Sequence, residues 1–284
     1  MRVFFICTQK FSEVLKNLIV AVSILWTGID YLGESGKWSS RGFYSGLLDF
    51  AGFIKPRGYF RQSLWSGKPA IYLGTYPVRG GNRSEDVLSS TVGKKEETLS
   101  MDAWPEWNYK DGQTIRVVCY TNAAKVQLML NNRQLGAIKD YDNKTGIIYW
   151  DVPYQPGELK AEGIDAAGNV ISVSSIKTSD DPYAIEVIPL SNNNKAQVAQ
   201  VAVQITDKNG RPVMHSDTEI SCSITGGATL LGLEAGNNSD MGDYTDNKQR
   251  TFRGRLMAYI RRNGRGTVRL VFSAPHLKEA VIVL

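Results

Sequence analysis

ILWTGIDYLGESGKWSSRGFYSGLLDFAGFIKPRGYFRQSLW, residues 24–65, combines three kinds of sequence pattern in one stretch. The short apolar run 23–26 indicates a strand, which leads through a Thr-Gly pair into a loop with Asp30 and Glu34. The segment 53–65 has helical spacing of its large apolar side chains and a proline near its start. The order of strand, loop and helix predicts one βα unit.

The side chains of this loop favour a sugar-binding site. In (β/α)₈ barrels, the loops at the carboxyl ends of the strands build the active site. Trp26 stands at the end of the predicted strand, and Asp30 and Glu34 follow it. An aromatic ring with a few polar groups beside it suits a small-molecule pocket. We therefore predict that this βα unit has the arrangement of a barrel strand, its loop and its helix.

Beyond this unit the pattern changes to short β-rich runs separated by turn sequences such as Asn131-Asn132. Two sets of runs predict a mainly β fold with two immunoglobulin-like β-sandwich domains, over 104–179 and 180–284. Residues 78–103, rich in Gly, Ser and charge, are predicted to be a polar linker. The predicted strands are 114–120, 125–130, 134–139, 147–152, 158–165, 170–176, 184–189, 198–207, 219–225, 256–260, 267–272 and 280–284.

Three motifs within the first stretch carry a family resemblance: W-T-G-x-D-Y-L-G-E, S-R-G-x-x-S-G-L-L-D-x-A-G-F-x-K and Y-F-R-Q-S-L-W. They resemble the last strand and helix of the glycoside hydrolase family 2 β-galactosidases. The resemblance implies that residues 1–77 hold the terminal strand and helix of an incomplete glycosidase barrel. Val117–Gly136 and Trp150–Pro156 resemble the family's β-sandwich, and Ile224–Leu231 resembles its final immunoglobulin-like domain. The resemblance extends from Ser23 to the end of the chain.

The resemblance implies a retaining glycosidase whose two catalytic glutamates lie on earlier barrel strands, upstream of this sequence. Retaining hydrolysis needs two carboxyl groups about 5 to 5.5 Å apart, and a barrel of about 250 residues holds them there. Glu13 lies in a stretch without the family pattern, and Glu34 belongs by resemblance to the loop after the last strand. We therefore assign no catalytic residue to this chain. By resemblance, Trp26, Asp30 and Glu34 are expected to bind substrate.

Two functions from different classes remain open. The first is a C-terminal fragment of a β-galactosidase-like retaining glycoside hydrolase, acting on β-galactosides or related glycans and inactive alone. It implies a carbohydrate substrate for the parent enzyme and an upstream polypeptide that completes the barrel. The alternative is a noncatalytic β-sandwich accessory protein that binds carbohydrate or a partner protein. Trp104, Trp107 and Tyr109 could stack on sugars, but their place at a predicted junction favours domain-interface packing.

Composition argues against several other classes. The chain has 284 residues, 42% hydrophobic and 21% charged, which is ordinary for a globular protein of two or three domains. Cys119 and Cys222 lie in apolar runs and are expected to pack as small hydrophobic residues. With only two histidines, we expect no metal site, no cofactor and no Ser-His-Asp triad. The polar stretch 237–247 lacks the spacing of a calcium loop.

The chain has more basic than acidic residues, with a net charge of +5, so nucleic acid has to be considered as a partner. Seven arginines lie between residues 250 and 269, but a strand points alternate residues to opposite faces and few aromatic residues are interleaved. A solvated or interdomain surface is therefore predicted. The apolar run 18–26 is too short for a membrane span and continues into the barrel-like motif, so no clear signal peptide is expected. Localisation stays open, although the family is often periplasmic or secreted.

Overall fold

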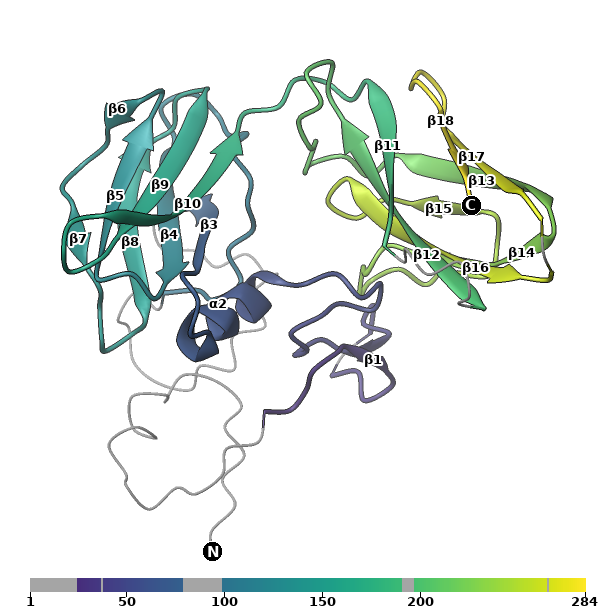
Figure 1. Ribbon diagram of the computed structural model, residues 1–284, viewed down its shortest axis with the longest axis horizontal. Coiled ribbons are helices and arrows are strands. Elements are labelled where there is room, and N and C mark those ends of the chain that lie inside the picture. Colours follow the sequence, from purple (N-terminus) through teal and green to yellow (C-terminus); the bar gives the residue numbers. More distant parts are fainter. Residues whose placement is uncertain (1–24, 37, 79–98, 191–196, 265) are drawn as a thin grey trace, which may run out of the picture. The chain divides into compact units, whose positions relative to one another are not determined.

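The computed structural model describes residues 25–36, 38–78, 99–190, 197–264 and 266–284. These residues are mainly β and divide into two units, shown in Figure 1 and treated separately below. Unit 1 takes in residues up to Gly28, Ser45–Leu47 and Ile54–Lys177, and unit 2 takes in Ile29–Tyr44, Leu48–Phe53 and Thr178–Leu284. Glu13, most of the apolar run 18–26 and most of the predicted linker lie outside the described residues.

Unit 1 is a β-sandwich of two antiparallel sheets. The first sheet has the order β3 (Ile71–Pro77), β4 (Thr114–Thr121) and β8 (Ile147–Pro153). The second has the order β10 (Val170–Lys177), β9 (Glu158–Ile164), β5 (Lys125–Leu130) and β6 (Arg133–Gln134), and β7 (Lys139–Asp140) also pairs with β5.

The period of two in β5 and β9 places alternate side chains in the core between the two sheets. Val126 and Leu128 of β5 meet Leu159 of β9 there. Strand β4 differs, since nearly every residue in it is buried. Val117 and Cys119 face the sandwich core, whereas the next residues along the strand face a second cluster on the outer side of the sheet. An element must therefore cover that outer face.

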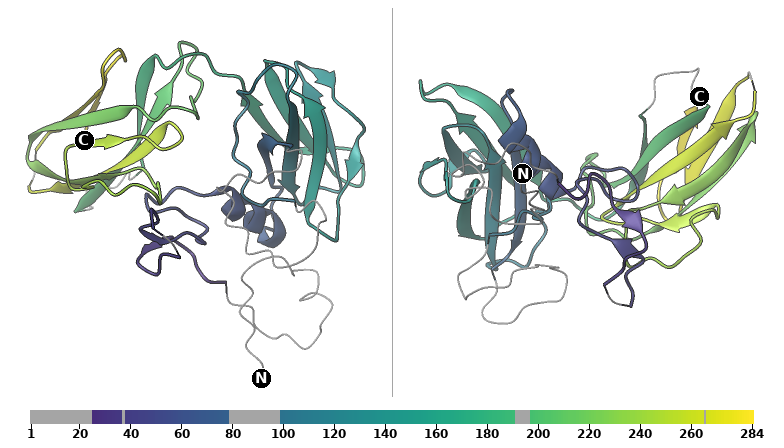
Figure 2. Two further views of the ribbon diagram at one scale, coloured as in Figure 1. Left: turned by 180° about the vertical axis from the view of Figure 1, so that it is seen from behind. Right: turned by 90° about the horizontal axis from the view of Figure 1, so that it is seen from below.

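The helix α2 (Pro56–Trp65) covers it, as Figures 1 and 2 show. Its proline occupies the first turn. N–H groups in the first turn have no partner within the helix, so a residue without an N–H is tolerated there. Phe60 packs edge-on against Tyr120 of β4 at 5.4 Å, and Tyr59 stacks on Tyr72 of β3 at 4.6 Å. The helical spacing of segment 53–65 is thus confirmed for residues 56–65, and the helix packs on the sandwich through these rings.

Several strand boundaries differ from those predicted. Strand β3 lies inside the range 1–77 assigned to the barrel, yet it pairs along its whole length with β4. The predicted strand 134–139 is two short segments, β6 and β7, that pair with opposite ends of β5. Leu25 and Trp26, the described part of the predicted strand 23–26, are not in a strand. Strand boundaries depend on which strands pair with each other, and local sequence patterns do not specify this pairing.

Unit 2 contains a second antiparallel sandwich. One sheet has the order β11 (Ala184–Pro189), β12 (Val198–Thr206), β16 (Arg255–Arg262) and β14 (Ala228–Glu234). The other has the order β15 (Lys248–Arg250), β13 (Glu219–Gly226), β17 (Val268–Ser273) and β18 (Ala280–Val283). Strands β14 and β15 were not predicted. The core includes Leu256, Ala258 and Ile260 of β16 and Phe272 of β17.

The outer face of the sheet containing β16 is covered by residues 48–53. Ala51 and Phe53 pack there against Met257 and Tyr259 of β16 and Ala202 of β12. The preceding part of the same segment forms the two-stranded sheet of β1 (Tyr31–Leu32) and β2 (Gly42–Phe43). Residues 29–44 and 48–53 therefore pack with the second sandwich, and their assignment to the last barrel unit stays a prediction.

Candidate functional site

Trp26 lies in unit 1 with half of its surface exposed, at 51%. Its main chain is held by the neighbouring segment: the Ser45 hydroxyl donates to the Trp26 carbonyl at 3.4 Å, and the Leu47 N–H is shared between the carbonyls of Thr27 and Gly28. The Trp26–Thr27 peptide bond is cis. The indole is thus presented at the surface of unit 1 from an anchored main chain.

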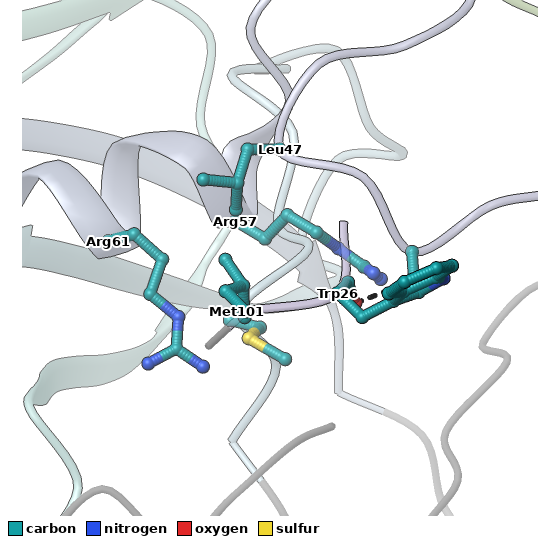
Figure 3. Close-up of a pocket in the computed structure, with 7 residues that line it drawn as sticks. Trp26, Leu47, Arg57, Arg61 and Met101 are labelled. Atoms are coloured by element: carbon teal, nitrogen blue, oxygen red, sulfur yellow. Dashed lines mark hydrogen bonds between the residues drawn. The ribbon is translucent and has the colours of Figure 1, made fainter. Parts of the chain in front are cut away.

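A shallow pocket lies beside Trp26, and Figure 3 shows the side chains that line it. In this view the Arg57 side chain reaches toward Trp26, and the Arg61 guanidinium points away from it. Arg57 forms a two-pronged ion pair with Asp102, whose Oδ1 accepts from Nε at 2.6 Å. Burial lowers the pKa of Arg61, and the neighbouring Arg57 lowers it further. The lining residues are Leu25, Trp26, Ser45, Leu47, Arg57, Arg61 and Met101.

Asp30 and Glu34 lie in unit 2, on the segment that packs against its outer sheet face. Asp30 is buried, with 4% of its surface exposed, and its N–H donates to the Leu48 carbonyl at 2.9 Å. Glu34 is exposed and accepts a hydrogen bond from the Tyr31 hydroxyl. Of the three residues expected to bind substrate, Trp26 and Glu34 are therefore presented at a surface, whereas Asp30 is enclosed.

Asp49 is a second buried carboxylate on this segment, at 1% exposure. Its Oδ1 accepts the N–H groups of Ala51 and Phe53 at 3.0 and 2.9 Å, and its Oδ2 lies 3.4 Å from Nη2 of Arg255 in β16. Burial raises the pKa of Asp49 to about 6, a rise that Arg255 opposes and the nearby Asp30 reinforces. The segment thus carries two neighbouring acidic groups beside one arginine.

A second ion pair joins the same segment to β14. Arg41 pairs with Glu234, and its guanidinium also lies over the Phe50 ring, 4.6 Å from the centroid. Asn238 holds the adjoining main chain, because its Oδ1 accepts the Gly42 N–H at 3.1 Å and its carbonyl accepts the Arg41 N–H at 2.9 Å. The polar stretch 237–247 therefore includes an anchor for β2.

Sequence reasoning missed Asp49, Arg41 and Glu234, and it assigned Arg255 to a solvated or interdomain surface. Arg255 is the partner of a buried carboxylate in the range predicted as a separate domain, and its guanidinium lies 4.2 Å from the centroid of the Phe53 ring. One signal was available, since Asp49 and Arg41 both fall within the S-R-G-x-x-S-G-L-L-D motif. Their partners lie about two hundred residues away in the sequence, with separations of 193 and 206 residues.

The aromatic cluster at Trp104, Trp107 and Tyr109 is not an exposed stacking strip. Trp107 is fully buried, its indole N–H donates to the Gln155 carbonyl, and its ring meets those of Tyr109 and Tyr154 inside the first sandwich. Packing was favoured correctly over sugar stacking, but these contacts lie within one domain. They stabilise the fold of unit 1.

Two further expectations concern cysteines and metals. Cys119 and Cys222 are free and buried, as expected, and burial raises the pKa of the Cys222 thiol to about 12. In the described parts of the chain, no group of three or more His, Cys, Asp or Glu side chains could hold a metal ion. None of the helices among the described residues is long and apolar enough to cross a membrane.

Each sandwich matches a known family model. Residues 190–283 match the family described as glycoside hydrolase family 2 C-terminal domain 5, and residues 112–172 match a domain of unknown function, DUF4982. The chain is similar to the C-terminal part of glycoside hydrolase family 2 enzymes. This finding confirms the family 2 resemblance and the mainly β fold class.

Individual relatives match from half of the chain to nearly all of it. The β-galactosidase BoGH2A of Bacteroides ovatus is 28% identical over 283 residues, which cover 96% of this chain and 29% of that protein. A β-glucuronidase of Formosa agariphila is 26% identical over 147 residues, 50% of this chain and 14% of that protein. The solved structure of a β-glycosidase from Bacteroides vulgatus superposes with a TM-score of 0.77 at 29% identity, covering 92% of this chain and 30% of that one. The chain thus spans less than a third of the relatives' length.

Proposed function

We propose that this chain is the C-terminal portion of a β-galactosidase-like retaining glycoside hydrolase, in which it completes the sugar site and does not supply the catalytic carboxylates. The observation that carries the proposal is the match of 96% of the chain to the C-terminal part of a β-galactosidase. Two motif-bearing segments, 25–28 and 29–53, precede the sandwiches and contain Trp26, Asp30 and Glu34. The residues up to the end of α2 are proposed to be the last unit of the barrel.

Each of the three residues has a different proposed role. Trp26 has an exposed indole beside a shallow pocket, which suits stacking on the apolar face of a sugar ring. Glu34 is exposed and its carboxylate suits a hydrogen bond to sugar hydroxyls. Asp30 is enclosed, so it orients the loop and has a supporting role. None of the three acts as nucleophile or general acid in this proposal.

The substrate class follows from the relatives and stays at the level of a β-linked glycoside. A β-galactosidase and a β-glucuronidase both match this chain. Their sugars differ in the configuration of the C4 hydroxyl and at C6, where galactose has a hydroxymethyl group and glucuronic acid a carboxylate. We favour β-galactosides on the motif resemblance alone, since coverage does not separate the two: the β-galactosidase matches 96% of the chain and a putative β-glucuronidase of Formosa agariphila matches 98%.

An activity assay with aryl β-galactosides and aryl β-glucuronides tests this proposal. The chain alone is expected to show no turnover, and a mixture with the polypeptide encoded immediately upstream is expected to hydrolyse the galactoside. Within the mixture, Trp26→Ala should reduce kcat/KM about tenfold, the loss expected from one sugar-stacking contact. Trp65→Ala is the matched control, since Trp65 is similarly exposed but lies on α2 outside the pocket. Turnover by the chain alone would refute the assignment of roles.

A further inference from the structure

We propose that Arg255 of the C-terminal sandwich is a positioning residue for the loop that carries Asp30 and Glu34, and that it acts through Asp49. The inference rests on the proposed function only in giving that loop a place at a sugar site. It assigns the second sandwich a role beyond that of an appended domain: one strand of its outer sheet fixes the geometry of the loop.

The first step connects Asp49 to Asp30 through the main chain. Leu48 precedes Asp49, and its carbonyl accepts the Asp30 N–H at 2.9 Å. Ile29 forms a parallel bridge with Leu48 at the same place. Any displacement of Asp49 therefore moves the acceptor that holds Asp30.

The second step is that Asp49 organises the turn that follows it. Its carboxylate accepts two N–H groups, from Ala51 and Phe53, and its own N–H donates to the Phe53 carbonyl at 2.9 Å. Gly236 lies against the same carboxylate, so closely that a Cβ there would come within 2.6 Å of Asp49 Cγ. The carboxylate is thus enclosed by main chain and has little room to move.

The third step identifies Arg255 as the charged group that β16 places beside Asp49. Its Nη2 lies 3.4 Å from Oδ2, and its guanidinium stacks over the Phe53 ring. Tyr259, on the same face of β16, donates its hydroxyl hydrogen to the Ala51 carbonyl at 3.0 Å. Because the side-chain period of a strand is two, Arg255 and Tyr259 face the same segment, and both ends of the turn at 49–53 are held.

The charges around Asp49 explain why an arginine is needed at position 255. Asp30 approaches from the loop itself, Tyr259 from β16, and Arg41, paired with Glu234, lies on the same segment. Burying a carboxylate without a charged partner destabilises the folded state, and a second carboxylate nearby adds repulsion. Without the guanidinium, Asp49 and Asp30 would repel each other in a poorly solvated place, and the turn would open.

Hydrogen–deuterium exchange on the full 284-residue chain tests the inference without requiring catalysis. Arg255→Met removes the charge and keeps a similar length of side chain. We expect the amides of Ala51, Phe53 and Asp30 to exchange about tenfold faster, the change expected for losing one hydrogen bond to a charged group. The amides of β12 and β13 should keep the rates they have in the unsubstituted chain.

Two further variants separate positioning from general stability. Arg250→Met removes an arginine from an exposed ion pair with Asp217 in the other sheet and should leave the loop amides unchanged. Arg255→Lys keeps the positive charge and should restore at least half of the lost protection. Equal acceleration throughout the sandwich, no acceleration at all, or a lysine variant no better than the methionine variant would each overturn the inference.

Activity of the mixture with the upstream polypeptide then shows whether the loop matters for the sugar site. Arg255→Met and Asp30→Asn should both lower kcat/KM for an aryl β-galactoside, and Arg255→Lys should recover part of it. If the exchange results are as expected but Asp30→Asn leaves hydrolysis intact, the loop is anchored by Arg255 and the proposed function is wrong for this loop. The two failures are thereby distinguished.

Discussion

Phe60 of α2 meets Tyr120 of β4 edge-on, with ring centroids 5.4 Å apart, and Tyr120 stacks in turn on Tyr72 of β3. This contact attaches the helix, which the sequence assigned to a barrel, to the outer face of a β-sandwich. Burial also raises the pKa of the Tyr120 hydroxyl well above its usual range, so the phenol stays neutral and donates to the Ser100 carbonyl.

Replacing Phe60 should detach α2 from the sandwich. Phe60→Ala is expected to lower the free energy of unfolding by about 3 to 5 kcal/mol, since it removes a buried ring and leaves a cavity. Trp65→Ala, on an exposed position of the same helix, should change it by less than about 1 kcal/mol. Denaturant unfolding followed by near-ultraviolet circular dichroism measures both. Equal losses in the two variants would contradict the packing described for α2.

The Arg57–Asp102 pair should contribute measurably to unit 1. Its side chains are 11% and 33% exposed, and the two hydrogen bonds are charge-assisted. A double-mutant cycle with Arg57→Met and Asp102→Asn should give a coupling energy of about 1.5 to 3 kcal/mol. The exposed pair Lys125–Asp140 is the control and should give less than about 1 kcal/mol. Similar coupling in both cycles would show that burial does not strengthen the Arg57 pair.

Asp49 should make the stability of unit 2 depend on pH. Burial raises its pKa from 3.8 to about 6 in the folded chain, against the influence of Arg255. The folded state therefore holds the proton more tightly, and the stability from the protonated form is complete below about pH 3.8 and is lost as the pH rises through about 6. The difference between the two limits is roughly 3 kcal/mol.

Asp49→Asn isolates this contribution from those of other carboxylates. The difference in unfolding free energy between the unsubstituted chain and Asp49→Asn should shift by roughly 3 kcal/mol between pH 4 and pH 7.5, in favour of the variant at the higher pH. Asp217→Asn, at an exposed position, serves as the control. A difference that stays constant across this range would show that Asp49 titrates normally.

Gly236 should tolerate no side chain, for two reasons that can be separated. Its φ of +80° is unfavourable for other residues by roughly 1 to 2 kcal/mol, and a Cβ would also press on Asp49. Gly168 has a similar φ of +91° but open space around it. Gly236→Ala should therefore lower the unfolding free energy by more than Gly168→Ala, and it alone should speed amide exchange at Ala51. Equal effects would mean that only backbone strain matters.

The sequence predicted the two sandwiches because each strand carries its own signal. In β5 and β9 the alternation of buried and exposed positions follows the alternation of residue types in the sequence, and the turns between strands have characteristic residues. The helix at residues 56–65 was found for the same reason, since its spacing and its early proline are local. The family motifs also lie in contiguous stretches, and the comparisons confirm the resemblance that they indicated.

Which strands pair, and which distant side chains contact each other, could not be predicted from local patterns. Strand β3 has no strong alternation and was not predicted as a strand, because its place depends on pairing with β4. The predicted role of Asp30, Glu34 and Trp26 rests on resemblance, and the structure shows which of them is enclosed only after distant segments fold together.

The sequence by itself determined the mainly β class, the helix, and the family to which the chain is similar, since periodicity, turn residues and motifs are all local properties. The tertiary structure alone decided that α2 packs on the first sandwich and that residues 29–44 and 48–53 are held by the second. These arrangements depend on Phe60 meeting Tyr120 and on Asp49 meeting Arg255. Contacts between residues so far apart form only when the chain has folded, because burial gives them both their geometry and their strength.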